Sequence, residues 1–232
     1  MSTELSRLSE LATADKTAQF LSLAHLLTPA ALMAAFEGLR KDASAGVDEV
    51  TYREYEQNVW MNIPALHHRL MSHQYRAQPL RRVYIPKETG HLRPIAVPAL
   101  EDKIVQKATA TVLTAIYEQD FLPCSYGFRP GLSPHDALDA IGRTMCRGPM
   151  AYVLEADIKG YFDAIVREQL MAFVERRIGD RSILRLIRKW IHIGVIEDGR
   201  LLVVETGTGQ GQVISPLLAN IYLHYVLDEV RA

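Results

Sequence analysis

The sequence places a carboxylate where a metal ligand could stand. Asp157 directly follows the mostly apolar run at 151–156 and precedes a glycine and two aromatic residues. The run predicts a buried strand, and a strand end is a rigid support for a metal ligand. Hard divalent cations prefer carboxylate oxygens. The alternative role for Asp157 is a strand-end cap or an ion-pair partner. Glu155 and Asp163 lie nearby, but the spacing assigns neither a catalytic role.

Two other segments carry groups that suit a phosphate ligand. Residues 206–216, Thr-Gly-Thr-Gly-Gln-Gly-Gln-Val-Ile-Ser-Pro, form a glycine-rich turn that allows close backbone approach. Residues 69–93 contain six cations against one acidic residue, Glu88. The six are Arg69, Arg76, Arg81, Arg82, Lys87 and Arg93. Arginine suits bidentate contact with phosphate, and lysine acts as a point charge. Generic surface charge is the alternative for these cations.

The overall composition is that of an ordinary soluble globular protein. The 232 residues include 26 Lys+Arg and 27 Asp+Glu, with 48% hydrophobic residues and a net charge of −1. Cys124 and Cys146 are too few for a disulfide framework and lack zinc-site spacing. We find no membrane-spanning run or signal peptide, so we expect a cytoplasmic protein without a membrane partner. The net charge does not exclude nucleic acid, because an acidic N-terminal region offsets the basic stretch at 69–93.

The patterning predicts a mostly helical chain around these segments. Helices are expected over 4–40 with a break at Thr28-Pro29, and over 51–60, 63–72, 101–117, from Pro134, 167–178, 180–193 and 216–230. Strands at 81–85 and 92–97 predict a projecting hairpin, because Pro86 and Pro94 confine them to edges or bulges. Asp-Gly between apolar runs predicts a second hairpin at 195–204.

Taken in order, these features resemble the bacterial group II intron-type reverse transcriptases over roughly residues 44–230. The blocks that carry the likeness are Ser44–Asp48, Arg82–Ile95, Ser125–Gly131, Ala156–Asp163 and Gly207–Tyr222. The resemblance implies an α+β right-hand polymerase fold, mostly helical, with a projecting β-hairpin and a partial antiparallel palm sheet. It divides the chain into an N-terminal helical region (1–45), fingers (46–150) and a partial palm (151–232) that includes a further fingers-like helix and hairpin at about 167–205.

The same resemblance implies an RNA-directed DNA polymerase, a nucleotidyltransferase that adds dNTPs to a primer 3′ hydroxyl with two Mg²⁺ ions. Asp157 would bind both ions, with the backbone carbonyl of Ile158 assisting. The partners it implies are an RNA template and primer, dNTPs and intron RNA. Arg81 and Arg82 would meet the backbone of template or intron RNA.

The resemblance also assigns a nucleotide pocket. Lys87 and Arg93 would clamp the triphosphate, and Phe162 would exclude a 2′-hydroxyl. Gln210 would contact the incoming nucleotide or the template, and Arg129 would lie near the same pocket. Core packing is the alternative for Phe162, and a structural ion pair is the alternative for Arg129.

The chain departs from the family pattern in two ways. The usual turn is Gly-Thr-Pro-Gln-Gly-Gly, whereas this chain has Gly209 for the proline and Gln212 for the last glycine. The added flexibility bears on where Gln210 is placed. The family's Tyr-x-Asp-Asp pair is also missing, since no Asp-Asp occurs in the 232 residues. We therefore expect fingers plus the first half of a palm, a piece of a longer polymerase that is catalytically incomplete by itself.

Two other functions remain open. An RNA-binding module that assists intron splicing would use the fingers and N-terminal region without polymerisation. A metal-dependent phosphohydrolase using Asp157 would leave the basic hairpin and the glycine-rich turn unexplained.

Overall fold

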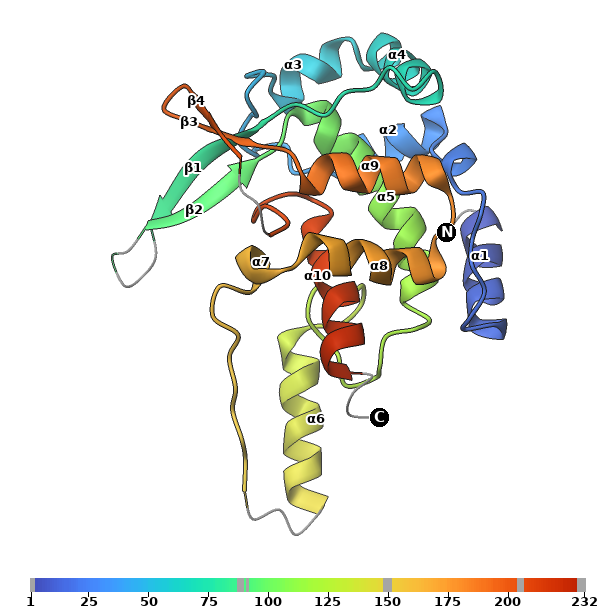
Figure 1. Ribbon diagram of the computed structural model, residues 1–232, viewed down its shortest axis with the longest axis vertical. Coiled ribbons are helices and arrows are strands. Elements are labelled where there is room, and N and C mark those ends of the chain that lie inside the picture. Colours follow the sequence, from blue (N-terminus) through green and yellow to red (C-terminus); the bar gives the residue numbers. More distant parts are fainter. Residues whose placement is uncertain (1–2, 87–89, 91, 148–151, 204–206, 229–232) are drawn as a thin grey trace.

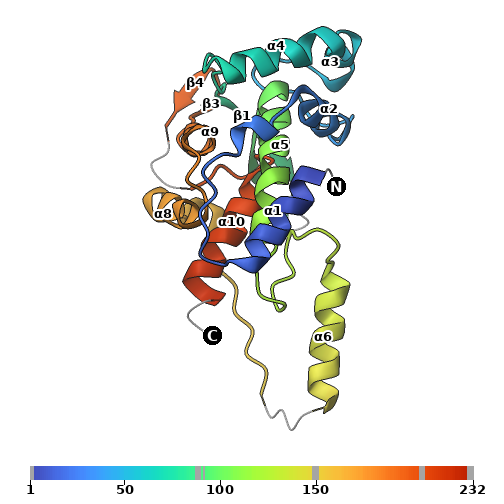
Figure 2. The same ribbon diagram turned by 90° about the vertical axis from the view of Figure 1, so that its right-hand side faces the viewer.

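A central helix, α5 (Leu100–Tyr117), organises the fold. The computed structural model describes residues 3–86, 90, 92–147, 152–203 and 207–228. Most residues of α5 are buried, including Ile104 and Leu113, because apolar side chains occur on several of its faces. The other body helices surround it (Figures 1 and 2). The expected helix at 101–117 is therefore the core of the molecule.

Helices from both halves of the sequence pack together around α5. They are α1 (Thr3–Ala14), the 3-10 turn Ala24–Leu26, α2 (Pro29–Glu37), α3 (Tyr52–Gln57), α4 (Val59–Met71), α7 (Tyr161–Ala164), α8 (Arg167–Arg177), α9 (Arg181–Ile191), α10 (Ser215–Leu223) and a π-helical turn at His224–Asp228. The helices α1, α2 and α10 contact α5, while α8 contacts both α9 and α10. Across the described part of the chain, no helix is long and apolar enough to cross a membrane.

Helix boundaries follow the capping residues. The Thr28 hydroxyl accepts a bond of 3.1 Å from the Ala31 N–H, and Thr51 forms a capping box with Glu54. The expected helix over 4–40 is wrong between α1 and the 3-10 turn. There Phe20 exchanges backbone bonds with Arg177 and Gly179 at the end of α8, so the segment pairs with another element rather than with itself.

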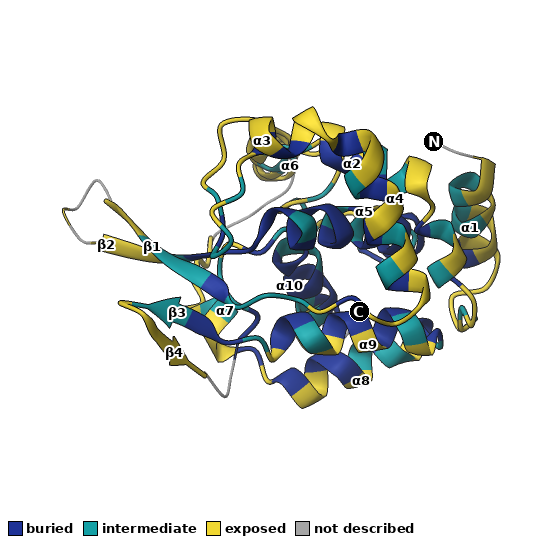
Figure 3. Cartoon of the chain, turned by 90° about the horizontal axis from the view of Figure 1, so that it is seen from above, coloured by how far each residue is buried: buried dark blue, intermediate teal, exposed yellow. Residues whose placement is uncertain are grey.

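Both predicted hairpins form, and they join in one mixed sheet of order β2-β1-β3-β4. The first hairpin consists of β1 (Leu80–Pro86) and β2 (Leu92–Val97), and the second of β3 (Val195–Glu197) and β4 (Arg200–Leu202). Strands β1 and β3 pair in parallel at Leu80 and Val195. The two hairpins extend together from one side of the helical body (Figure 3). Of the two proline-bearing strands, β2 lies at the sheet edge as expected, whereas β1 lies between β2 and β3. Pro86 is nevertheless unpaired on that side, because β1 pairs with β3 only at Leu80 and Arg81.

A different segment stands away from the body, and we call it the arm: α6 (Pro134–Arg147) and residues 152–158 (Figures 1 and 2). No side chain of α6 is buried. The strand expected at 151–157 is absent over the described residues 152–157, and Tyr152 and Leu154 are each more than 90% exposed. A strand needs a neighbour for its backbone N–H and C=O groups, and no described strand pairs with this segment. The described residues therefore confirm an α+β fold. The expected antiparallel palm strand at residues 152–157 does not form.

Candidate functional site

The glycine-rich turn and helix α7 form one unit. The Gly207 N–H donates to the Ile165 carbonyl (3.0 Å), and the Thr208 N–H donates to the Phe162 carbonyl (3.1 Å). A Cβ atom at Gly207 would lie 2.8 Å from the Phe162 carbonyl oxygen, so only glycine permits this approach. The half-buried Phe162 side chain packs against the main core. The turn and Phe162 are thus fixed relative to each other.

The hairpin of β1 and β2 also bonds to this unit. The Ala96 N–H of β2 donates to the Gln210 carbonyl (2.8 Å), and the buried Arg167 donates to the Gly207 carbonyl (2.9 Å). Gln210 and Arg82 both line a small cavity of about 60 Å³ that lies against this junction. Three segments far apart in the sequence therefore meet here, and we call them the platform: residues 94–96, α7 and residues 207–212.

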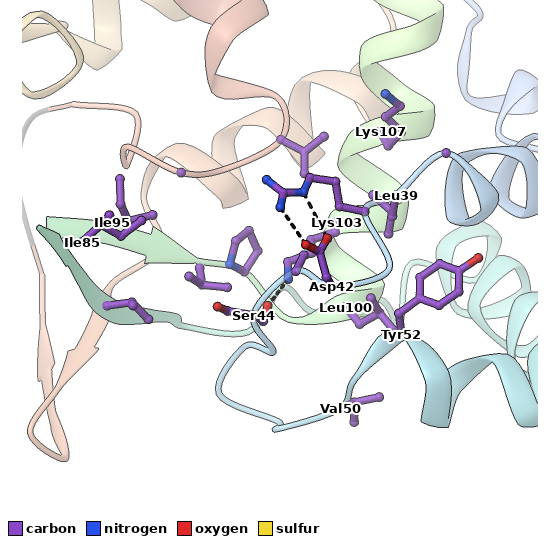
Figure 4. A pocket seen from close by; sticks show the side chains of 18 residues that line it. Leu39, Asp42, Ser44, Val50, Tyr52, Ile85, Ile95, Leu100, Lys103 and Lys107 are labelled. Carbon is purple, nitrogen blue, oxygen red and sulfur yellow. Dashed lines mark hydrogen bonds and ion pairs between the residues drawn. The ribbon is translucent and has the colours of Figure 1, made fainter. Parts of the chain in front are cut away.

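The opposite face of the hairpin borders a larger cavity of about 540 Å³ (Figure 4). Ile85 and Ile95 line its wall. Arg93 pairs with Ile85 across the hairpin, so both project from this face. Lys103 lies in the cavity and donates to the Ser44 carbonyl (2.5 Å), and burial lowers the pKa of its ammonium group. The exposed Arg93 therefore lies on the cavity side rather than beside Arg82.

The other hairpin cations have different surroundings. Lys87 lies outside the described residues, so its predicted clamp is a matter for experiment. Arg82 lies 3.7 Å from the carboxylate of Glu197 on β3, and the Tyr84 hydroxyl donates to the same carboxylate. These contacts tie the two hairpins together. The Arg81 Nε is buried and has no hydrogen-bond partner among the described residues.

Asp157 lies on the arm rather than at the end of a buried strand. Its side chain is exposed and makes no hydrogen bond or ion pair with another described residue, and Ile158 is 51% exposed. The ion-pair and strand-cap alternatives for Asp157 thus have no support in the described residues. No group of three or more His, Cys, Asp or Glu side chains in the described ranges could hold a metal ion. One carboxylate and one carbonyl do not fit a two-ion site by themselves.

Arg129 is enclosed by its own loop. Its guanidinium pairs with Glu118 (3.0 Å) and donates to the carbonyls of Leu122 and Ser125, each at 2.8 Å. The side chain is only 10% exposed. These bonds use the donors that a nucleotide phosphate would need, so the structure favours the ion-pair alternative for Arg129.

Sequence patterning did not assign a role to two buried amides, Gln212 within the platform and Gln106 beside it. Gln106 and Gln212 are 0% and 3% exposed, and Gln106 donates to Gln212 (2.8 Å). A glutamine among apolar neighbours in the 101–117 helix is a signal that could have found Gln106. Its partner is 106 positions away, and spacing does not predict such a contact.

Comparison with known proteins identifies the family of this arrangement. Residues 85–232 match the family model described as reverse transcriptase (RNA-dependent DNA polymerase). The matched range contains the last two residues of β1, the whole of β2, Asp157 and the complete glycine-rich turn. This chain belongs to the reverse transcriptase family. The family generally uses divalent metal ions.

Named relatives place the chain near intron-encoded members of the family. Protein YkfC of Escherichia coli is 40% identical over 186 residues, covering 77% of this chain and 48% of that protein. The group II intron-encoded protein LtrA of Lactococcus lactis is 36% identical and covers 82% of this chain and 30% of that protein. The chain thus spans less than half the length of these two relatives.

A solved structure shows the same fold. A chain of a solved partial Cas6-RT-Cas1–Cas2 complex superposes with a TM-score of 0.56 and is 27% identical. The match covers 89% of this chain and 34% of that one. It supports the α+β fingers and palm fold for nearly the whole chain.

Proposed function

We propose that this chain is the fingers and part of the palm of an RNA-directed DNA polymerase that adds dNTPs to a primer 3′ hydroxyl. The observation that carries the proposal is the platform, where the Thr208 N–H bonds the Phe162 carbonyl and the Ala96 N–H bonds the Gln210 carbonyl. Three motifs of the family thereby meet at one place. A phosphohydrolase would not need this junction of hairpin, aromatic residue and glycine-rich turn.

The chain's own residues bind and orient the nucleotide in this proposal. Lys87 and Arg93 hold the triphosphate, with Arg93 acting from the cavity face of the hairpin. Phe162 rejects a ribonucleotide by steric contact with its 2′-hydroxyl. Gln210 contacts the base pair from the platform. Arg129 supports the loop at 122–129 instead of touching the nucleotide.

The proposed metal is Mg²⁺, which suits phosphoryl transfer and oxygen ligands. Asp157 and the carbonyl of Ile158 would be its ligands in this chain. Because these two groups do not fit two ions, further carboxylates must come from a segment that carries Tyr-x-Asp-Asp. When bound, the ions would stabilise the attacking and leaving oxygens of the displacement.

The proposed macromolecular partners are an RNA template, a primer and intron RNA. The named relatives support the intron RNA, since they include an intron-encoded protein and a nuclear intron maturase of Arabidopsis thaliana that is 29% identical over 136 residues. The same relatives favour a second candidate, a splicing cofactor that binds intron RNA without polymerising. We also propose a cytoplasmic location, because free, exposed cysteines such as Cys124 and Cys146 suit a reducing compartment.

Primer extension on an RNA template distinguishes the two candidates. A polypeptide that contains this chain and a Tyr-x-Asp-Asp segment should incorporate dNTPs, and Asp157→Asn should reduce incorporation at least about a thousandfold by removing metal charge stabilisation. The 232-residue chain alone should be inactive. Incorporation by the chain alone that depends on Asp157 would contradict the expected need for further carboxylates. Tight intron-RNA binding without any extension would favour the splicing cofactor.

The clamp is tested separately through the nucleotide dependence of extension. Lys87→Ala and Arg93→Ala should each raise the apparent KM for dNTP about tenfold, because each removes a charge-assisted bond to phosphate. Lys16→Ala is the matched control, since Lys16 contacts Asp120 just beyond the C-terminal end of α5, whereas the hairpin precedes its N-terminal end. An unchanged KM for a hairpin variant would remove that residue from the clamp.

A further inference from the structure

The buried Gln212 side chain holds the glycine-rich turn in place through hydrogen bonds. Its Nε2 donates to the Thr208 carbonyl (2.7 Å) and to the Trp190 carbonyl at the end of α9 (3.1 Å). Its Oε1 accepts from the Gln106 Nε2 (2.8 Å), and the Gln106 Oε1 accepts from the Val213 N–H (2.9 Å). Three of these four hydrogen bonds link the turn to α5 and α9, and the fourth, from Gln212 to Thr208, lies within the turn.

The backbone at Gly209 depends on this side chain. Gly209 has φ +69°, in the left-handed region, whereas proline is held near −65°. A Cβ atom at Gly209 would lie 2.8 Å from the Gln212 Nε2. The Gln212 amide thus occupies the space in which a side chain at 209 would begin. The turn adopts a conformation that a proline at 209 cannot share, and the two departures from the usual family turn belong together.

The Thr208 peptide connects Phe162 and Gln210, the two residues proposed to contact the nucleotide. The Thr208 N–H donates to the Phe162 carbonyl, and the Thr208 carbonyl accepts from both Gln212 and the Ser215 hydroxyl (2.9 Å). Two residues later the Gln210 carbonyl accepts from Ala96 on the hairpin. Movement of the Thr208 peptide would therefore displace Gln210 relative to Phe162.

We propose that Gln212, with Gln106 behind it, is a positioning residue for the nucleotide pocket. Its hydrogen bonds to α5 and α9 hold the turn in one conformation, as the rigid ring of proline would in the usual family turn. Since Gln212 is 3% exposed, it acts through the placement of Gln210 and Phe162 and does not touch the nucleotide. The expected effect on KM rests on the proposed polymerase function, whereas the expected effect on hydrogen exchange rests on the hydrogen bonds alone.

The first test replaces Gln212 with methionine, which keeps the side-chain volume and removes the amide. Gln212→Met should raise the apparent KM for dNTP about tenfold in the polypeptide with a Tyr-x-Asp-Asp segment, because the three buried hydrogen bonds of the Gln212 amide are lost. Hydrogen exchange at the Thr208 and Val213 amides should accelerate by a similar factor in the 232-residue chain. Tyr117→Phe is the control, because it loses a buried bond to the Val174 carbonyl away from the turn.

The second test uses the dependence between positions 209 and 212. Gly209→Pro alone should raise the KM at least as much as Gln212→Gly, because proline cannot adopt the φ angle at 209. The double variant G209P/Q212G restores the usual family turn and should have a lower KM than either single variant. If the KM change of the double variant equals the product of the two single changes, positions 209 and 212 act independently, which would contradict their shared role.

The outcomes separate this inference from the proposed function. If the unsubstituted polypeptide polymerises and Gln212→Met leaves both KM and amide exchange unchanged, the positioning role is refuted. A KM change equal to that of Tyr117→Phe would also overturn it, because general destabilisation would then explain the effect. If the unsubstituted polypeptide incorporates no dNTP, the polymerase proposal fails, and exchange at Thr208 and Val213 alone decides whether Gln212 fixes the turn.

Discussion

The platform and the arm differ in how their residues are held, although both carry motifs of the family. In the platform, Thr208 and Gln212 are 1% and 3% exposed and bond to neighbours from three segments. In the arm, no α6 side chain is buried, and Asp157 contacts no other described residue through a hydrogen bond or ion pair. The described residues therefore hold the platform, which we propose contacts the nucleotide, but they give no such support to Asp157, the proposed metal ligand.

This difference has a physical cause in the two kinds of interaction. The platform closes because glycines let backbone segments approach and amides satisfy the buried carbonyls. The arm has apolar side chains on α6, including Leu138, Ile141 and Met145, yet no described element covers them. An apolar helix face contributes to stability only when it is buried against another element.

The largest expected contrast compares two leucines. Leu113→Ala in α5, where the side chain is 0% exposed, should lower the free energy of unfolding by about 2–5 kcal/mol through lost burial and a cavity. Leu138→Ala in α6, where the side chain is 63% exposed, should change it by less than about 0.5 kcal/mol. Chemical denaturation of the 232-residue chain measures both. Equal losses would contradict the difference between body and arm.

A second prediction concerns a buried carboxyl in the body. Burial raises the pKa of Asp102 to about 6, although bonds from the Tyr75 hydroxyl (2.5 Å) and the Gln78 N–H (2.9 Å) act in the opposite direction. The folded state thus holds its proton more tightly than the unfolded state. Stability from this group is present below pH 4 and is lost as pH rises through about 6, by up to about 3 kcal/mol.

The control for this pH dependence is Asp102→Asn, which keeps the shape and cannot ionise. The free energy of unfolding of the unsubstituted chain, measured from pH 4 to pH 7, should fall relative to that of the variant. Parallel curves for the two proteins would show that Asp102 has its ordinary pKa.

The smallest expected contrast compares two helix caps. Thr28 caps α2, which packs on α5, and Thr28→Ala should lower the free energy of global unfolding by about 1 kcal/mol. Ser133 caps α6 together with Asp136. Ser133→Ala should reduce helix content measured by circular dichroism while leaving the midpoint of global unfolding in place. A shifted midpoint for Ser133→Ala would mean that α6 folds cooperatively with the body.

Local signals explain what could be predicted from the sequence. The caps at Thr28, Thr51 and Ser133 and the Asp198-Gly199 turn depend on residues a few positions apart, and all of them form. The hairpins and the central helix follow from equally local patterns. The placement of the Gln212 side chain could not be predicted, because it bonds to Gln106 and Trp190, which lie far away in the sequence.

The structure differs from the sequence-based expectation at the strand before Asp157 and in the surroundings of Arg129. The apolar run at 151–156 has strand composition, but a strand also needs a neighbour, and composition does not reveal whether one is present. Arg129 matched a pocket motif, yet Glu118 and two carbonyls of its own loop bind it first. The roles of the motif residues stay predictions, and the surroundings of Asp157 and Arg129 required the structure.

Hydrogen exchange of the 232-residue chain, resolved by residue, tests the central difference most directly. The amides of Gly207, Thr208 and Val213 should exchange slowly, because each donates to a protein acceptor. The amides at 152–158 should exchange at the rate of an unfolded peptide, since the segment has no strand partner among the described residues. Strong protection at 152–158 would mean that the chain completes its own support for Asp157, and rapid exchange at Thr208 would mean that the platform is not closed; either result would contradict the structure described above.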